Sequence, residues 1–368
     1  MKLLYLTTAL HPDDYQNIVN IGKSVPNPSN QNFHTKLIAY LEKNHEVRVI
    51  SRRTNSKKLF TRHQEKDNYI YPGFLNIPIV RNFMTISSGI SYGQKWPADY
   101  IIVDVLNLTL MELALRIKHK TNIPIIGVVT DNPINLSNVR NIYIQNVFKK
   151  AAQCDAFIGL TRSLLNLFNP QHKPTLKIPG FIPLNDLQSE KTTEEFAYFG
   201  GALYARYGVD ILLDTFKKDP PLKLKVAGHG PLRQEILNLN SESIEFLNII
   251  TPEKALELSK MATININPRP FDSALEEYSI PSKLIDYIFA GKPTISTENK
   301  PIMNIVGNNV FWIKEVSVYC LTNAMETILA QKETWEAQAL EAKKLLEISL
   351  GPEQFNQNFI NLTKQIKN

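Results

Sequence analysis

The stretch Tyr278-Ser-Ile-Pro-Ser-Lys-Leu-Ile-Asp-Tyr-Ile-Phe-Ala-Gly-Lys-Pro-Thr-Ile295 decides the fold of the second half of the chain. Its loop closes at Pro281, a helix is predicted from Ser282, and the Gly-Lys-Pro turn leads into a short apolar strand. A helix that passes through a tight turn into a buried strand is the repeating unit of a parallel α/β sheet. The stretch therefore predicts that fold class.

The same alternation of apolar strands and helical spacing continues along the chain. Strands are predicted at 2–8, 45–50, 100–104, 123–129 and 156–160, and again at 196–199, 222–227, 244–247, 263–266 and 293–296. A polar stretch around residues 183–195 separates the two series and suits a linker.

We therefore expect an α/β protein of two Rossmann-like domains facing each other across a cleft. The N-terminal domain is predicted at residues 1–182 and the C-terminal domain at 183–350. A final helix over 351–368 could pack on either domain, including back on the first. Ligands of such sheets bind at the carboxyl ends of the strands, so the cleft is the expected site.

Length and composition favour an ordinary globular protein. The chain has 368 residues, 43% of them hydrophobic and 21% charged, which excludes disorder and coiled coil and suggests two domains. Cys154 and Cys320 have no metal-ligand or redox spacing, as is typical of a reducing compartment. No window is apolar over the ~20 residues that a membrane span needs. We expect a cytoplasmic protein.

Charge divides unevenly between the two halves. Residues 1–183 hold 22 Lys and Arg against 11 Asp and Glu, whereas the remainder holds 19 against 24. The basic residues lack aromatic interleaving or a binding motif, so no nucleic-acid partner is expected. Two readings remain open: peripheral binding to an anionic membrane, or a basic surface that only keeps the protein soluble. The basic residues that favour the first lie at Arg52, Arg53, Lys57, Lys58 and Arg62 and at the end of 141–150.

The helix predicted from Ser282 carries the most informative chemistry. Free amides at a helix start, with Ser282 and Lys283 beside them, suit a diphosphate, because the helix dipole favours an anion. Asp286 lies one turn later and can accept hydrogen bonds from ribose hydroxyls. The alternative is an ordinary capped helix with a solvated carboxylate.

This region resembles the C-terminal signature of glycosyltransferase family 4, in the variant that has Pro-Ser-Lys before an acidic residue and Tyr. Asp286 stands where the family usually has its second, ribose-binding glutamate, and Tyr278 stands where it has the first. The resemblance implies a GT-B glycosyltransferase that uses a nucleoside-diphosphate sugar and retains the anomeric configuration.

Two glycine turns are similar to the same family. Tyr198-Phe-Gly-Gly-Ala-Leu203 precedes Arg206, and Val226-Ala-Gly-His-Gly-Pro-Leu232 follows in the expected order. Glycine lets backbone approach phosphate closely, although any tight strand-to-helix turn can require it. The resemblance implies a nucleotide-sugar site formed by Gly200, Gly201, Arg206, Gly228, His229, Tyr278, Ser279, Ile280, Ser282, Lys283 and Asp286.

The first half resembles the family in outline only. The usual glycine-rich loop is replaced by the polar segment Ser24–Asn32, which could offer amides at a helix start near Asn32. Asp131 follows the strand at 123–129, where enzymes of this fold often carry a catalytic His or Asp. An Asx turn before Pro133 is the alternative.

Few residues are needed for the chemistry that the resemblance implies. Asp131 is expected to orient a hydroxyl, and Arg206 and Lys283 to neutralise the departing diphosphate. His11 and His229 could line the cleft. The seven histidines show no paired spacing, so we expect neither a metal nor another cofactor.

The favoured function is a retaining glycosyltransferase that moves a sugar, with a UDP-sugar as the expected donor, to a glycan or lipid-linked acceptor in bacterial surface polysaccharide or glycoconjugate synthesis. A catalytically silent GT-B protein that binds a transferase or a glycan is the first alternative. A nucleotide-sugar epimerase on the same fold is the second, and turnover of a panel of donors would separate the three.

Overall fold

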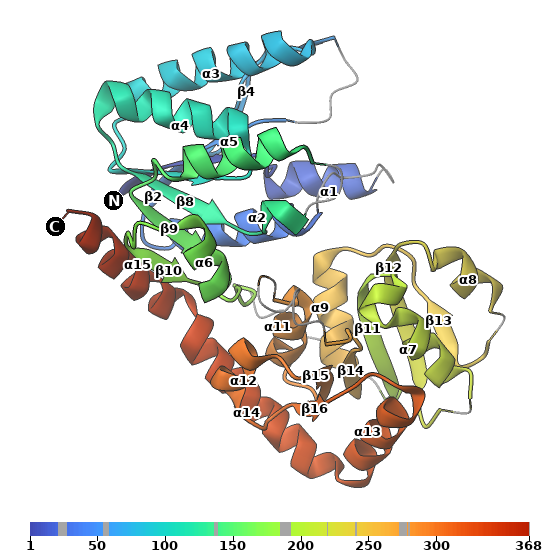
Figure 1. The fold of residues 1–368 in the computed structure, drawn as a ribbon. Coiled ribbons are helices and arrows are strands. Elements are labelled where there is room, and N and C mark those ends of the chain that lie inside the picture. Colours follow the sequence, from blue (N-terminus) through green and yellow to red (C-terminus); the bar gives the residue numbers. More distant parts are fainter. Residues whose placement is uncertain are drawn as a thin grey trace. The chain divides into compact units, whose positions relative to one another are not determined.

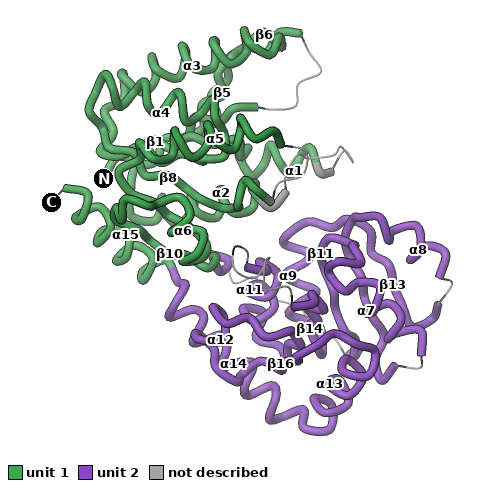
Figure 2. Tube along the Cα trace, in the orientation of Figure 1, with its two compact units in different colours: residues 1–181, 277–279, 352–368 green, residues 182–276, 280–351 purple. Residues whose placement is uncertain are grey.

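The computed structural model of the chain describes residues 1–20, 28–53, 59–135, 139–184, 193–218, 220–239, 241–271, 278 and 280–367. These residues form two compact α/β units (Figure 2). Unit 1 comprises residues 1–181, 277–279 and 352–368, and unit 2 comprises residues 182–276 and 280–351. The chain therefore returns to unit 1 at its C-terminus.

The largest sheet of unit 1 has eight strands, which run parallel except where β4 pairs with β5. In sheet order they are β10 (Thr175–Lys177), β9 (Ala156–Gly159), β8 (Ile125–Val129), β7 (Tyr100–Asp104), β1 (Lys2–Thr7), β2 (Glu46–Ser51), β5 (Tyr69–Tyr71) and β4 (Gln64–Lys66). The central strands β7 and β8 are buried along their whole length. This burial explains their continuous apolar runs, since a parallel sheet is covered on both faces.

Helices cover both faces of this sheet. In Figure 1, α3, α4 and α5 lie on one face, and α2 and α15 on the other. The helices of unit 1 are α1 (Pro12–Asn20), α2 (Pro28–Glu42), α3 (Pro78–Lys95), α4 (Leu108–Thr121), α5 (Asn141–Ala151), α6 (Arg162–Phe168) and α15 (Pro352–Lys367), with a short 3₁₀ turn η1 at Pro133–Asn135.

Helix α3 packs closely on α4 through small residues. A Cβ atom added to Gly89 would lie 2.5 Å from the Leu113 side chain, and one added to Gly93 would lie 2.7 Å from that of Ile117. Glycine at both points allows this close contact, whereas a larger residue would have to displace the ends of the Leu113 and Ile117 side chains. Just before α3, strand β6 (Phe74–Leu75) pairs antiparallel with β3 (Phe60–Thr61) in a separate two-stranded sheet.

Helix α15 packs on unit 1 by its apolar face. Phe355 contacts the rings of Tyr40 and Phe181, and Phe359 contacts that of His45. The Tyr100 hydroxyl also donates to the backbone carbonyl of Thr363 at 3.0 Å. The C-terminal segment is therefore part of the core of unit 1.

Unit 2 contains a six-stranded sheet whose pairings are all parallel. In sheet order its strands are β13 (Ile244–Phe246), β12 (Lys223–His229), β11 (Phe196–Ala202), β14 (Ile264–Asn267), β15 (Thr294–Thr297) and β16 (Phe311–Ile313). The α/β class expected from the sequence is thus confirmed in both units.

The helices of unit 2 form two groups. Helix α7 packs on α13, while α11 contacts both α9 and α14. These helices and their neighbours are the 3₁₀ turn η2 (Ala205–Tyr207), α7 (Val209–Phe216), α8 (Arg233–Asn238), α9 (Pro252–Met261), α11 (Ser282–Phe289), α12 (Lys300–Val306), α13 (Val318–Ala330) and α14 (Lys332–Leu350).

Candidate functional site

The carboxyl ends of β11 and β12 lie in direct register in unit 2. Gly201 pairs with Gly228, and Ala202 pairs with His229. Gly228 has φ +149°, and a Cβ atom there would lie 1.8 Å from the Gly201 carbonyl oxygen. Only glycine allows this approach of the two strands. The glycines predicted from the sequence therefore meet at one edge of the sheet.

Helix α11 is attached to this edge by Tyr287. The Gly200 amide donates to the Tyr287 hydroxyl at 2.9 Å, and the hydroxyl donates to the Gly200 carbonyl at 3.3 Å. Beneath them lies Tyr198, whose ring centroid is 6.1 Å from that of Tyr287. A Cβ atom on Gly200 would lie 2.3 Å from the Tyr198 hydroxyl, so this glycine is also sterically required.

Asp286 lies beside the same pair of tyrosines. Burial raises the pKa of Tyr198, and the negative charge of Asp286 raises it further. Burial is likewise the main cause of the raised pKa of Tyr287, to which the charges of Tyr198 and Asp286 add. The half-buried Asp286 carboxylate is therefore close to the glycine end of β11, where it can accept hydrogen bonds from hydroxyls of a ligand.

The start of α11 has the features expected of an anion site. Its N-cap residue is Pro281, whose side chain makes no capping hydrogen bond to the first amides. Ser282 is exposed at the first helical position, and Lys283 is half-buried beside it. Helix amides and an ammonium group together favour a phosphate group at this position. The choice between this site and an ordinary capped helix with a solvated carboxylate stays a prediction.

Arg206 lies in an aromatic setting that the sequence did not reveal. Its guanidinium is 5.1 Å from the ring centroid of Tyr204 and 4.9 Å from that of Tyr207. The guanidinium of Arg269 lies 5.7 Å from the same Tyr207 ring. Cation–π contacts of this kind help to hold a guanidinium group in place. Sequence reasoning did not identify Arg269.

Backbone contacts fix these two arginines within unit 2. Gly208, at φ +73°, packs so closely on the Pro268 carbonyl that a Cβ atom would lie 1.9 Å from the oxygen. Thr297 at the end of β15 donates to the Arg269 carbonyl at 2.7 Å. The turn carrying Arg206 and the loop carrying Arg269 are thus held against each other.

His229 presents its side chain at the end of β12. The residue is exposed, while its backbone carbonyl accepts a hydrogen bond from the Leu203 amide at 3.0 Å. The backbone of the glycine turn is therefore fixed, and the imidazole is left at the surface of unit 2.

The three predicted residues before Pro281 differ in their placement. Tyr278 belongs to unit 1, where it packs partly buried against the hydrophobic core. Ile280 is buried, with 8% of its surface exposed, and Ser279 lies outside the described residues. Pro281 begins α11, so no continuous helix carries Tyr278 on the same face as Asp286.

Asp131 follows β8 in unit 1 and does not form the expected Asx turn. Asn132 forms it instead, because its Oδ1 accepts from the Ile134 amide at 3.0 Å. Although Asp131 remains exposed overall, surrounding protein displaces water from its carboxylate. This partial burial, followed by the negative charge of Asp104, raises the pKa of Asp131 to about 6.

Asp104 lies next to a buried pair that the sequence also did not reveal. The His34 Nδ1 atom is 2.6 Å from the Tyr5 hydroxyl, and the His34 Nε2 atom is 3.7 Å from Asp104 Oδ2. Burial lowers the pKa of His34 even though Asp104 opposes this effect. A neutral His34 with its proton on Nε2 can accept a hydrogen bond from the Tyr5 hydroxyl at Nδ1. Its Nε2–H group then points towards Asp104.

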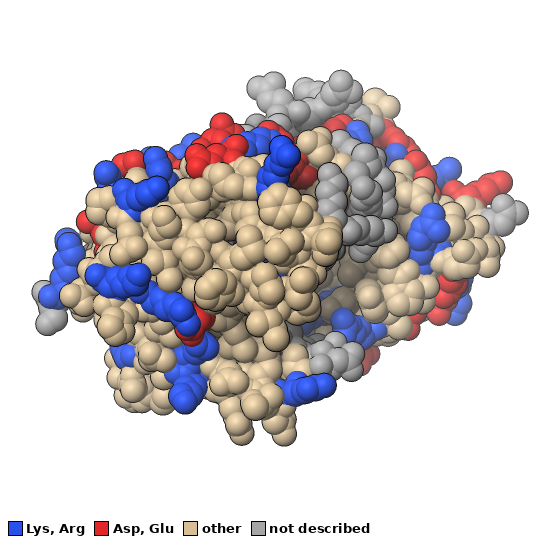
Figure 3. Space-filling model, turned by 90° about the horizontal axis from the view of Figure 1, so that it is seen from above, with Lys and Arg blue, Asp and Glu red and all other residues tan. Residues whose placement is uncertain are grey.

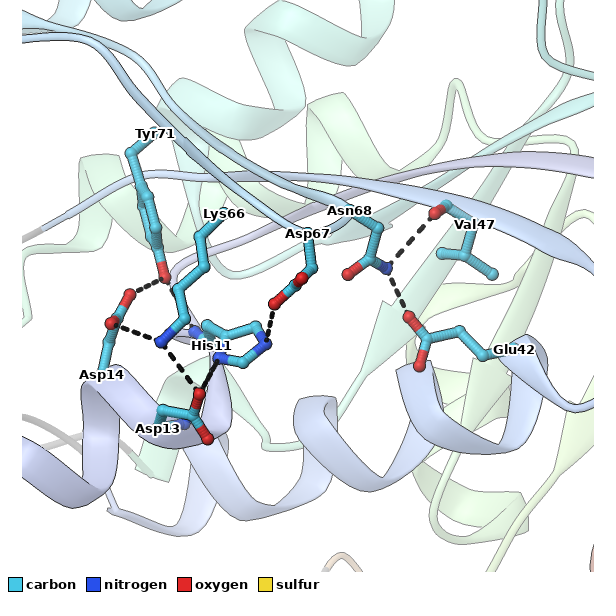
Figure 4. Close-up of polar contacts among 9 residues, drawn as sticks. All are labelled: His11, Asp13, Asp14, Glu42, Val47, Lys66, Asp67, Asn68 and Tyr71. Atoms are coloured by element: carbon cyan, nitrogen blue, oxygen red, sulfur yellow. Dashed lines mark hydrogen bonds and ion pairs between the residues drawn. The ribbon is translucent and has the colours of Figure 1, made fainter.

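His11 belongs to a polar network that attaches α1 to the β4–β5 hairpin (Figure 4). Its Nε2 atom lies 3.2 Å from Asp67, and its Nδ1 atom lies 3.7 Å from Asp13. Lys66 reaches both Asp13 and Asp14, at 3.0 and 3.1 Å. The arrangement gives His11 a structural role at the end of β1. The polar segment Ser24–Asn32 lies partly outside the described residues, and α2 begins at Pro28.

The described residues form neither a metal site nor a membrane-spanning helix. Within that part of the chain, no group of three or more His, Cys, Asp or Glu is arranged to hold a metal ion. No described helix has the length and hydropathy required to cross a membrane. A cavity of 460 Å³ lies at the amino ends of β11 and β12, opposite the glycine edge, where Glu194 and Glu195 would repel a diphosphate.

Comparison with known families assigns most of unit 2. Residues 185–345 match the family described as glycosyl transferases group 1. This segment contains the glycine edge, the two arginines and helix α11. No curated protein matches the sequence.

Solved structures share the fold across the whole chain. Sucrose-phosphate synthase from Thermosynechococcus elongatus is 12% identical with a TM-score of 0.64, covering 98% of this chain and 99% of that one. HepE from Anabaena, in complex with UDP, is 14% identical with a TM-score of 0.64, and the match covers 98% of this chain and 99% of HepE. TarM from S. aureus is 11% identical with a TM-score of 0.66, and the match covers 99% of this chain and 100% of TarM. These likenesses confirm the expected GT-B fold.

Proposed function

We propose that this glycosyltransferase, whose residues 185–345 belong to the glycosyl transferases group 1 family, binds a UDP-sugar in unit 2 and transfers the sugar with retention to a glycan or lipid-linked acceptor. The observation that carries the proposal is the bond between Tyr287 and Gly200. It brings a glycine strand end, the start of helix α11 and the Asp286 carboxylate close together.

Each part of a nucleotide diphosphate has a counterpart among these residues. The amides at the start of α11 and the Lys283 ammonium suit the diphosphate, and Arg206 and Arg269 add two guanidinium groups. Asp286 suits the ribose hydroxyls. UDP is the proposed nucleotide because structures of HepE and TarM, which share the fold, contain it.

The cations have a chemical task beyond binding. As the bond from the anomeric carbon to the diphosphate breaks, the diphosphate leaves with the electron pair and gains negative charge. Arg206 and Lys283 would stabilise that charge, which is where electrostatic catalysis acts most strongly. We propose that these groups replace a divalent metal, so that EDTA leaves turnover unchanged. Retention follows from the resemblance to family 4.

The acceptor side of the proposal rests on unit 1. Asp131 would orient an acceptor hydroxyl, since its raised pKa makes it a better hydrogen-bond acceptor than an ordinary carboxylate. A lipid-linked or glycan acceptor of surface polysaccharide synthesis would agree with the excess of 22 basic over 11 acidic residues in the first half, which would attract anionic lipid at the membrane surface.

A panel of nucleotide sugars tests the donor. Nucleotide release is measured with and without polyprenyl-phosphate-linked and soluble glycan acceptors, and NMR of the product gives its anomeric configuration. We expect release from a UDP-sugar, increased by an acceptor, with the configuration retained. Tight UDP binding without turnover of any donor would instead favour a silent binding protein, and an inverted product would contradict retention.

A further inference from the structure

Large apolar side chains are exposed around the start of α3. Leu59 and Phe60 have 68% and 52% of their surface exposed, and Ile77, Ile79 and Phe83 have 48%, 83% and 67%. We call these five residues the α3 patch. Single exposed apolar residues are ordinary, but a group of this kind is typical of an interaction site.

Backbone contacts gather the α3 patch into one surface. Strand β3 carries Phe60 and pairs with β6, which leads directly into α3. The Asn76 amide donates to the Leu59 carbonyl at 2.7 Å, so Leu59 lies beside the residue before Ile77. Ile79 and Phe83 are four residues apart and share one face of the helix.

The opposite face of α3 is already occupied. Thr85, Gly89 and Gly93 are buried, and the two glycines pack against α4. The residues that continue the outer face beyond Phe83 are Ser87, Ser91 and Gln94. The outer face is therefore apolar over its first two turns and polar afterwards. Its apolar residues are not needed for the packing of α3 on α4, which uses the opposite face.

The segment of sequence that carries the α3 patch is basic. Residues 47–98 contain nine Lys and Arg against two carboxylates, Glu65 and Asp67. Both carboxylates are engaged, Glu65 with His63 at 3.0 Å and Asp67 with His11 at 3.2 Å. In Figure 3, the side of unit 1 on which α3 lies is largely uncharged, with Lys and Arg atoms and some Asp and Glu atoms at its edges.

Two of the arginines are held without an acidic partner. Arg52, only 9% exposed, donates to Asn82 Oδ1 at 2.9 Å, and Arg81 donates to Asn76 Oδ1 at 3.2 Å. Neither pairs with a carboxylate of the described residues, and the Nε atom of each has no hydrogen-bond partner there. Burial and the nearby positive charge of Arg81 lower the pKa of Arg52 to about 10. An anion between them would relieve this repulsion.

We propose that the α3 patch is a docking surface for an anionic lipid bilayer, in which Ile79 and Phe83 enter the headgroup region and the exposed Arg62 and half-exposed Arg81 meet lipid phosphates. A mixture of exposed apolar and basic residues is what a peripheral membrane face requires. A second copy of this chain fits less well, because a two-fold contact would place the same basic surfaces against each other. The inference rests on the proposed function only for its biological purpose, since docking would bring the enzyme to a lipid-linked acceptor.

Sedimentation with vesicles of phosphatidylcholine, with and without phosphatidylglycerol, tests the surface. The whole protein should bind only the anionic vesicles, and part of the binding should persist at high salt because apolar insertion is not screened. Ile79→Ser with Phe83→Ser should lower partitioning about tenfold or more. Arg81→Gln should lower it by a smaller factor and reduce its salt dependence.

A matched control separates this surface from general stickiness. Tyr319→Ser with Ile348→Ser removes two apolar side chains of unit 2 that are 77% and 63% exposed, and should leave partitioning unchanged. Thermal unfolding checks that every variant is folded. Absence of wild-type binding, an equal loss in the control, or a wild-type dimer that Ile79→Ser with Phe83→Ser dissociates would each overturn the proposal.

Nucleotide release with a soluble acceptor tests the proposed function independently of vesicle binding. That activity should be the same in the wild type and in the Ile79→Ser, Phe83→Ser variant, because neither residue belongs to the donor site. Loss of vesicle binding with full turnover would uphold both ideas, whereas turnover without any vesicle binding by the wild type would reject only the docking surface.

Discussion

The Tyr287 hydroxyl bonds to both backbone groups of Gly200, accepting from its amide at 2.9 Å and donating to its carbonyl at 3.3 Å. A side chain of α11 thereby fixes the helix start relative to the carboxyl end of β11. Tyr198 lies next to this pair, but its buried hydroxyl has no hydrogen-bond partner among the described residues. Replacing each tyrosine by phenylalanine therefore removes a buried hydroxyl that is hydrogen-bonded in Tyr287 and unbonded in Tyr198.

Tyr287→Phe should destabilise unit 2 and weaken donor binding, because it leaves the buried Gly200 amide without its acceptor. A cost of about 1–3 kcal/mol is expected for an unsatisfied buried group. Tyr198→Phe is the control and should be neutral or slightly stabilising. Chemical denaturation and calorimetric titration with UDP measure both effects. Equal behaviour of the two variants would show that the bond has no part in holding the site.

The cations should act on the diphosphate rather than on the nucleoside. Lys283→Ala, Arg206→Ala and Arg269→Ala should each weaken UDP binding about tenfold and leave uridine binding nearly unchanged, since charge-assisted hydrogen bonds are lost only with phosphate. Lys254→Ala removes an exposed cation that pairs with Glu257 and serves as the control. A similar loss for uridine and UDP would contradict these roles.

The sequence predicted those parts of the fold that depend on local patterns. Buried parallel strands such as β7 and β8 are apolar throughout, and the spacing of Phe355 and Phe359 marks the apolar face of α15. Strands of two or three residues, such as β3, β10 and β16, are too short to show a period. The unit to which α15 attaches depends on contacts with distant residues and was left open.

In the candidate site, too, some residues were predictable from local sequence and others depend on distant contacts. Gly200, Gly228 and the helix start at Ser282 were predictable, because close approach and helix capping are local requirements. The pairing of Arg269 with Tyr207 depends on neighbouring loops that are 62 residues apart in sequence. Tyr278 was assigned by resemblance to the family motif, in which it stands at the place of the first glutamate, and the structure groups it with unit 1.

Asp286→Asn tests recognition of the ribose. The amide keeps one acceptor oxygen but loses the negative charge, so the bonds from ribose hydroxyls should weaken and UDP affinity should fall about five- to tenfold. A 2′,3′-dideoxy analogue of UDP lacks those hydroxyls and should bind both proteins alike. Isothermal titration with the two ligands decides the matter, and an equal change for both would make Asp286 a structural residue.

Asp131 should set the acidic limb of the pH–activity profile. With its pKa near 6, the carboxylate is ionised at neutral pH and becomes protonated below about pH 6, so kcat/KM should fall as the pH is lowered through that value. Asp131→Ala should reduce turnover by about a hundredfold and abolish this limb while leaving the affinity for UDP unchanged, because UDP is proposed to bind unit 2.

Asp104→Asn separates the two causes of the raised pKa of Asp131. The variant removes the negative charge but keeps an oxygen for the Leu106 amide, which donates to Asp104 Oδ1 at 3.0 Å. The pKa of Asp131 should fall while staying above its ordinary value of 3.8, because burial remains the larger cause. The acidic limb should therefore move to lower pH in Asp104→Asn, and an unmoved limb would mean that another group controls it.

The same shift has a consequence for stability with a definite sign. A carboxyl group whose pKa is raised on folding contributes stability below about pH 4 that is lost as the pH rises through about 6. Asp131→Asn cannot titrate, so its free energy of unfolding relative to the wild type should rise between pH 4 and pH 6 and then level off. Since Asp131 is exposed, solvent screening will keep this change small. Denaturation of both proteins across that range measures it, and a difference that falls with rising pH would show that folding lowers the pKa of Asp131 instead.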